Sequence, residues 1–176
     1  MIKLFKDIAA KVVLNKISKQ TKLPEQRFNL FFQKSYSFLL VMPENEDDFT
    51  NSFLILEYLE NKKKNISILT YDYRVSKLPV KFKSRVIDHG VKDMNKFDLP
   101  VKDFTNRLNE KKFDVVLDLS KDGNYFHKIL VCKIKSLLKV GFEKPNGDKF
   151  YNVMIRIEEN NSENSYQNFL NCLRMF

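Results

Sequence analysis

The sequence contains no tryptophan and little cysteine, histidine, glycine or proline: its 176 residues include 2 Cys, 2 His, 4 Gly and 5 Pro. A chain of this size needs no disulfide framework, so we expect Cys132 and Cys172 to be reduced thiols without a disulfide partner. Neither His89 nor His127 lies in a CxxC or HxxxH pattern, so the sequence predicts no metal site. The scarcity of glycine and proline excludes collagen-like and low-complexity chains.

Long apolar runs are also absent. The longest, residues 38–42 and 53–56, are far shorter than the roughly 18 residues that a transmembrane helix needs. Lysines and Asp7 interrupt any apolar region near the N-terminus, so we expect no signal peptide and a cytoplasmic protein. A length of 176 residues predicts one domain, and 43% hydrophobic residues are enough to build its core.

Charge is unevenly distributed along the chain, whose formal net charge is +9. Residues 1–34 carry eight basic and two acidic side chains, and residues 35–61 carry six acidic and no basic ones. Residues 62–112 carry fourteen basic and six acidic side chains, whereas residues 113–176 are nearly neutral. Two separate basic regions favour an acidic partner such as nucleic acid or an anionic lipid surface.

Residues 2–18 have the apolar spacing of a helix, with Lys3, Lys6 and Lys11 on the side opposite the apolar face. The apolar positions are Ile2, Phe5, Ile8, Ala9, Val12 and Val13. We expect this apolar face to pack onto the rest of the domain. Alternatively, the helix leaves the domain and binds RNA or anionic lipid. Residues 27–34 form an aromatic-rich connection between this helix and the first strand.

Strands and helices alternate over the rest of the chain. Apolar runs of strand length predict strands at residues 35–42, 66–71, 85–88, 113–119, 139–142 and 153–157. Helical spacing predicts helices at residues 49–60, 101–110, 125–135 and 162–176. The predicted fold is a single Rossmann-like three-layer α/β domain with a mostly parallel sheet at residues 35–176. A basic amphipathic helix and its connector, residues 1–34, precede this domain.

In such a sheet the ligand site lies beyond the carboxyl ends of the strands. The first loop there, residues 43–48, has no glycine and four carboxylates, so we predict no nucleotide cofactor. Four side chains in these loops are candidates for acid–base catalysis: Asp47, Asp48, Asp118 and His89. The structural alternatives are that acidic residues stabilise a helix N-terminus, and that the residues after Asp118 cap the next helix. The good capping residues are Ser120, Asp122 and Asn124.

Basic and aromatic residues are interleaved between residues 62 and 85. The cations are Lys62, Lys63, Lys64, Arg74, Lys77, Lys81, Lys83 and Arg85. Phosphates attract such cations, and bases stack on rings such as those of Tyr71, Tyr73 and Phe82, as in single-stranded nucleic-acid binding. Alternatively, residues 80–86 form an edge strand whose lysines discourage aggregation.

Three stretches of the sequence, in their order and separation, carry a family resemblance. They are FLLVMPENEDDFTNSFLILEYL, KFDVVLDLS and LLKVGF, within residues 38–142. They resemble the N-terminal half of the ADP-heptose:lipopolysaccharide heptosyltransferases, which implies one Rossmann-like half of a GT-B fold. In that family a Gly-Asp pair in the first loop is linked to acceptor activation. Asp47 or Asp48 is the nearest match here, without the glycine. The half that binds the nucleotide-sugar would follow Gly141, where this sequence is short, so we do not predict an enzyme.

As a whole, the chain is similar to a group of small uncharacterised bacterial proteins with this half-fold, which implies no function. Its charge favours a non-catalytic binding module that docks RNA or a ribonucleoprotein, such as the ribosome. The docking surface would combine residues 62–85 with Lys3, Lys6 and Lys11. Two alternatives stay open: a glycosyltransferase-like enzyme or half-enzyme acting on a sugar or nucleotide-sugar with a partner protein, and a peripheral protein of anionic membranes.

Overall fold

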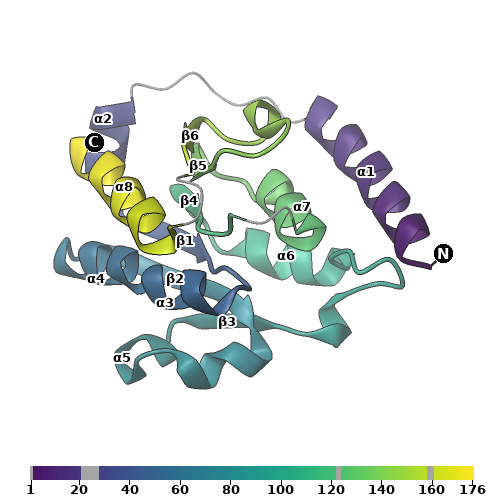
Figure 1. Ribbon diagram of the computed structural model, residues 1–176, viewed down its shortest axis with the longest axis horizontal. Helices are drawn as coiled ribbons and strands as arrows, with labels where there is room; N and C mark the ends of the chain where they lie inside the picture. The colour runs from purple at the N-terminus through teal and green to yellow at the C-terminus, as the bar shows by residue number, and fades with distance from the viewer. Residues whose placement is uncertain (1, 21–27, 122–123, 158–160) are drawn as a thin grey trace.

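Six strands form one sheet at the centre of the molecule (Figure 1). The computed structural model describes residues 2–20, 28–121, 124–157 and 161–176. The strands are β1 (Ser37–Val41), β2 (Asn65–Tyr71), β3 (Val86–His89), β4 (Val115–Asp118), β5 (Leu138–Phe142) and β6 (Val153–Ile155). Their order is β3-β2-β1-β4-β5-β6, and every neighbouring pair is parallel. This strand order confirms the predicted Rossmann-like α/β fold. From β1 the chain adds strands towards one edge of the sheet, and from β4 it adds them towards the other edge, so the switch in strand order lies between β1 and β4.

Buried apolar side chains on both faces explain why these segments are strands. In β1, Phe38 and Leu40 belong to the core on one face of the sheet, and Leu39 and Val41 to the core on the other. None of these four side chains is exposed. Successive residues of a strand point to opposite faces, so a strand that is apolar at successive positions requires a helical layer on each side.

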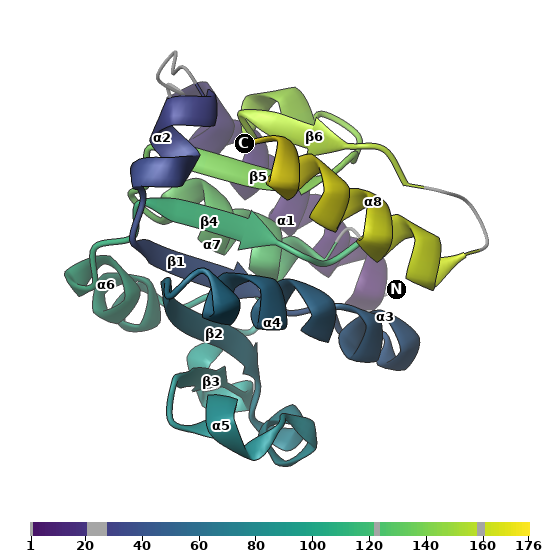
Figure 2. The ribbon, with the colours of Figure 1, turned by 90° about the vertical axis from the view of Figure 1, so that its left-hand side faces the viewer.

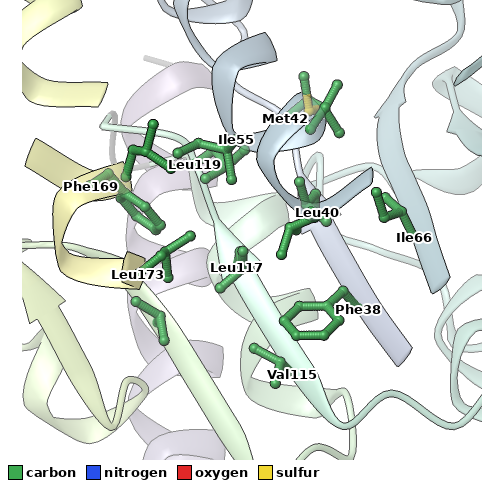
Figure 3. Close-up of a cluster of buried hydrophobic side chains, with 14 of the residues drawn as sticks. Phe38, Leu40, Met42, Ile55, Ile66, Val115, Leu117, Leu119, Phe169 and Leu173 are labelled. Carbon is green, nitrogen blue, oxygen red and sulfur yellow. The ribbon is translucent and has the colours of Figure 1, made fainter. Parts of the chain in front are cut away.

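One helical layer packs on the face that carries Phe38 (Figure 2). Its helices are α2 (Phe28–Lys34), α3 (Glu46–Asn51), α4 (Phe53–Asn61), α5 (Val80–Lys83) and α8 (Ser162–Met175). Figure 3 shows the core of this layer, where Ile55 of α4 and Phe169 and Leu173 of α8 lie in one cluster with Leu117 of β4. The predicted closing helix is therefore confirmed, and its apolar side chains Tyr166, Phe169, Leu170 and Leu173 are buried.

The opposite layer contains α6 (Lys102–Glu110) and α7 (Tyr125–Lys133), and α1 (Ile2–Gln20) lies on the outer side of α7 (Figure 1). Phe104 of α6 and Phe126 of α7 fill the core between these helices and the sheet. The 3-10 helices are η1 (Asp72–Lys77), η2 (Val91–Asp93) and η3 (Gly147–Lys149). Over the described part of the chain, no helix has both the length and the hydropathy of a membrane span.

Three local predictions differ from the structure. Residues 49–60, predicted as one helix, belong to α3 and α4, which meet at Ser52, where the hydroxyl donates to the backbone oxygen of Phe49. The predicted connector before β1 is helical from residue 28 to 34. The edge-strand alternative at residues 80–86 is wrong, because residues 80–83 form a helical turn that buries Phe82 in the core. In so short a segment, burial of one aromatic ring outweighs an alternating pattern.

The packed face of α1 also differs from the prediction. Ala10 and Leu14 are buried in the core beside α7, whereas Phe5, Ile8 and Val12 are largely exposed. Apolar residues occupy both sides of this helix, so their spacing alone does not define which side faces the domain.

Candidate functional site

The carboxyl ends of β4 and β5 carry a buried polar cluster around Asp118, the last residue of β4. Its Oδ2 accepts hydrogen bonds from Nζ of Lys144 at 2.7 Å and from the hydroxyl of Tyr151 at 2.5 Å. Its Oδ1 accepts from the hydroxyl and the backbone N–H of Ser120, at 2.7 and 3.0 Å. All four residues are buried, so the whole carboxylate is satisfied without solvent.

Gly141 makes room for this cluster. It pairs with Asp118 in the register of β4 and β5, and the ring of Tyr151 lies directly against it. A Cβ atom at position 141 would stand 2.7 Å from that ring. The absence of a side chain therefore lets the Tyr151 hydroxyl reach the Asp118 carboxylate.

Charge balance keeps Asp118 ionised. Burial alone would raise its pKa, but the charge of Lys144 and the hydrogen bonds from Lys144 and Tyr151 outweigh burial, so the pKa lies below its ordinary value. Burial and the negative charge of Asp118 raise the pKa of Tyr151 well above its ordinary value. The cluster is thus an Asp118 carboxylate that forms an ion pair with Lys144 and accepts a hydrogen bond from a protonated tyrosine.

A second buried feature is a pair of histidines near the carboxyl ends of the strands. His89 ends β3 and His127 lies in α7, with 3.1 Å between their Nε2 atoms. Burial lowers the pKa of His89 to about 3 and that of His127 to about 4. Both rings are neutral at pH 7, so one Nε2 donates to the other. It follows that one Nδ1 is an acceptor and the other a donor, and neither has a hydrogen-bond partner in the described part of the chain.

Polar side chains connect the histidine pair to the surface. The ring of Tyr71 packs against the rings of His89 and His127, with centroids 4.3 and 5.5 Å away. The Tyr71 hydroxyl accepts a hydrogen bond from the side-chain amide of Asn124 at 2.7 Å and donates to the carboxylate of Glu44 at 3.3 Å. Glu44 is exposed, and Asn124 caps α7 by accepting from the N–H of Phe126. The capping alternative therefore holds for Asn124, whereas Asp122 lies outside the described residues.

The four candidates for acid–base chemistry do not form one site. His89 and Asp118 are both buried at this edge of the sheet. Asp48 instead forms an ion pair with Lys121 at 2.6 Å and accepts from the hydroxyl of Ser162. Asp47 is exposed in the first turn of α3, where negative charge stabilises the helix. Over the described residues, no group of three His, Cys, Asp or Glu side chains could hold a metal ion.

Of the eight cations at residues 62–85, four form ion pairs with described residues and four do not. Ion pairs occupy half of them: Arg74 and Lys77 with Glu46, Lys81 with Glu57, and Arg85 with Glu60. Arg74 is also buried. Lys64 donates to two backbone oxygens at the end of α2. Exposed cations that form no ion pair within the described chain are Lys62, Lys63 and Lys83.

The N-terminal cations that the structure describes do not line the same part of the surface as the cations of residues 62–85. Lys6 forms an ion pair with Asp98 at 2.7 Å, and Lys11 is exposed on α1. The side chain of Lys3 lies outside the described part of the chain. Neither Lys6 nor Lys11 lines the cavity that the amino ends of the strands form.

That cavity, here called the basic groove, has a volume of about 420 Å³. It is lined by Ser37, Asn65, Ile66, Ser67, Ser84, Arg85, Val86, Lys111, Lys112 and Phe113. Lys111 and Lys112 are exposed, and Tyr36, beside Ser37, leaves 63% of its surface exposed. The sequence reasoning missed Lys111, Lys112 and Tyr36. The predicted parallel sheet could have indicated these residues, because residues that precede neighbouring parallel strands lie together at the amino ends of the strands.

The chain matches a known protein family over nearly its whole length. The family model of DUF6913, described as a family of unknown function, matches residues 6–176. No curated protein and no solved structure matches the chain. The family match covers the sheet and both helical layers, so it also includes the buried cluster and the basic groove.

Proposed function

The chain belongs to DUF6913, a family of unknown function, and we propose that it binds single-stranded RNA, without catalysis, in the basic groove. The observation that carries this proposal is the convergence of cations and hydroxyl groups from separate segments on the amino ends of the strands. RNA is available in the cytoplasm, the location that the composition favours.

Positive charge in the groove is weakly compensated. Lys111 and Lys112 line it and form no ion pair among the described residues, while Arg85 is neutralised by Glu60. Lys83 immediately precedes the lining residue Ser84 and is exposed. Lysines at this density attract phosphates and release their counterions, which makes the affinity depend on salt.

An exposed aromatic ring, that of Tyr36, directly precedes the lining residue Ser37 in the sequence. The backbone N–H groups of Tyr36 and Ser37 both donate to Oδ2 of Asp114, at 2.8 and 2.9 Å, which fixes the chain where it enters β1. The ring of Tyr36 is left free to stack on a base. Stacking on an aromatic ring tolerates any base, so we expect binding to single strands with little sequence preference.

The opposite edge of the sheet suits RNA poorly. Glu44, Glu46 and Asp47 are exposed there and would repel phosphates. The cations nearby, Arg74 and Lys77, are already bound to Glu46. This charge arrangement restricts the proposed RNA surface to the amino ends of the strands.

Fluorescence anisotropy with a labelled single-stranded oligoribonucleotide tests the proposal. We expect binding that weakens at least about tenfold between about 50 and 200 mM salt. The Lys111→Ala/Lys112→Ala variant should lose about tenfold or more in affinity, and Tyr36→Ala should lose about fivefold or more.

The matched control is Lys92→Ala/Lys149→Ala, which removes the same charge from exposed sites outside the lining of the groove. It should bind nearly as well as the unaltered protein. Equal losses in both double variants would show that total charge, not the groove, attracts the RNA. Absence of binding at low salt would exclude the proposal.

A second candidate function is a small-ligand site at the buried histidine pair, which would take a sugar or nucleotide-sugar as the heptosyltransferase resemblance implies. The observation that favours it is the pair of buried Nδ1 atoms of His89 and His127 without hydrogen-bond partners in the described chain. Calorimetric titration with free sugars and nucleotide-sugars tests it. Binding that disappears in His127→Leu would support this candidate, and no heat with any of these compounds would exclude it.

A further inference from the structure

The outer side of α1 is an apolar surface that the described part of the chain leaves uncovered. On the inner side, Ala10, Leu14 and Ser18 repeat every fourth residue and are buried. On the outer side, Leu4, Ile8 and Val12 repeat with the same spacing, and their side chains are exposed. Residues four apart stack along one side of a helix, so these two rows lie on different sides of α1.

Phe5 lies beside this exposed row, and together the four side chains expose a large apolar area for so short a stretch of helix. Leu4 is 63% exposed, Phe5 64%, Ile8 50% and Val12 63%. Single exposed apolar residues are ordinary on protein surfaces, but four within three helical turns form a contiguous patch, which marks an interaction site. The patch does not depend on detachment of α1, because Ala10 and Leu14 hold the inner side against the domain.

Cations continue the outer side where the apolar residues end. Lys16 follows Val12 by four residues, and Lys11 and Lys19 are also exposed. Lys16 and Lys19 line a hollow of about 470 Å³ together with Val12 and Asn15. The described part of its lining therefore joins the apolar patch, at Val12, to two lysine side chains and an amide.

Asp7 is the one acidic side chain in the sequence of α1, and it is half-buried rather than exposed. The exposed side thus offers cations without carboxylates over the described residues. If two copies met through this surface, lysines would face lysines or apolar groups, which disfavours self-association. The complementary partner is one that presents apolar groups next to negative charges.

We propose that the outer side of α1 docks on an anionic lipid bilayer. Leu4, Phe5, Ile8 and Val12 enter the boundary between headgroups and acyl chains, while Lys16 and Lys19 bind lipid phosphates at the hollow. The helix stays packed on α7 and carries the whole domain to the membrane. This surface is separate from the basic groove, whose described lining contains no residue of α1.

Co-sedimentation with vesicles tests the proposal with the full chain. Vesicles of phosphatidylcholine with about one-third phosphatidylglycerol should bind the protein, and vesicles of phosphatidylcholine alone should bind it at least about tenfold more weakly. Phe5→Ser/Ile8→Ser and Lys16→Ala/Lys19→Ala should each reduce binding to anionic vesicles about tenfold or more. All substituted side chains are exposed, and the melting temperature checks that each variant folds.

The Lys92→Ala/Lys149→Ala variant is again the charge-matched control and should keep its vesicle binding. Equal binding to both vesicle types, or no effect of the α1 variants, would overturn the proposal. A concentration-dependent dimer that Phe5→Ser/Ile8→Ser abolishes would assign the patch to a second copy and overturn it as well. RNA binding by the α1 variants is measured separately, because it should be unchanged and reports only on the groove.

Discussion

Nζ of Lys144 lies 2.7 Å from Oδ2 of Asp118, and their side chains are 1% and 0% exposed. The same oxygen accepts a hydrogen bond from Tyr151, so the carboxylate joins the end of β4 to the chain on both sides of η3. Removing two charges from water is costly, and their attraction offsets that cost only when the remaining lone pairs also have partners. Here Ser120 supplies those partners.

Breaking this ion pair on one side should be more damaging than removing both charges. We expect Lys144→Met to lower the free energy of unfolding by about 3–5 kcal/mol, because it leaves a buried carboxylate without a counterion. Lys144→Met/Asp118→Asn should lose clearly less, since no unpaired charge remains. Urea denaturation of both variants measures the difference. A double variant as unstable as Lys144→Met would contradict this account of the cluster.

Gly141 should tolerate no side chain. In Gly141→Ala the added Cβ would stand 2.7 Å from the ring of Tyr151, which is buried and bonded to Asp118. We expect a loss of about 1–3 kcal/mol in thermal or urea unfolding. Gly147→Ala is the control: its Cβ would meet Sδ of Met154 at 2.6 Å, but that side chain is flexible and 40% exposed. A loss at Gly147 equal to that at Gly141 would argue against the steric explanation.

The central strands β1 and β4 were predictable because they are apolar at successive positions, a pattern that only a sheet covered on both faces requires. Asp118 stood out for the same reason, as a carboxylate directly after buried residues. Lys144 and Tyr151 were not recognised, because their partner is 26 and 33 residues away in sequence. Register brings them together: Asp118 pairs with Gly141, and Lys144 follows shortly after the same strand.

The basic residues show where sequence patterns lose information. Arg74 and Lys77 lie in a basic run, yet the acidic loop that neutralises them comes from a different strand end, some 30 residues earlier. Likewise, α1 has apolar residues on two sides, and only contact with α7 decides which side is buried. Charge counts along the chain therefore predicted a basic protein, but not which cations remain unpaired.

The buried histidines should make the protein sensitive to acid. Burial holds the pKa of His89 at about 3 and of His127 at about 4, below the unfolded value of about 6.5. The unfolded chain therefore binds more protons in acid, and stability falls as the pH decreases from about 6.5 towards about 3. We expect a loss of about 1–2 kcal/mol per histidine between pH 7 and pH 5, measured by urea denaturation.

His89→Phe/His127→Leu removes both imidazoles and should flatten the stability profile between pH 5 and pH 7. Below about pH 4, loss of the Asp118 charge adds its own destabilisation, because the folded pKa of that carboxyl is also lowered. A variant whose stability falls as steeply as that of the unaltered protein between pH 7 and pH 5 would place the sensitivity elsewhere.

Arg74 and Lys111 are both cations, but their surroundings predict opposite consequences of removal. Arg74 is buried, donates to Glu46 at 2.8 Å and to the backbone oxygen of Glu44, and stacks over Phe49. We expect Arg74→Ala to lower the free energy of unfolding by about 1–3 kcal/mol and to leave RNA affinity nearly unchanged. Lys111→Ala should change stability by less than about 0.5 kcal/mol and weaken RNA binding. Urea denaturation and anisotropy on the same two preparations separate the effects, and a loss of RNA affinity in the folded Arg74→Ala protein would place the RNA at the carboxyl ends of the strands instead.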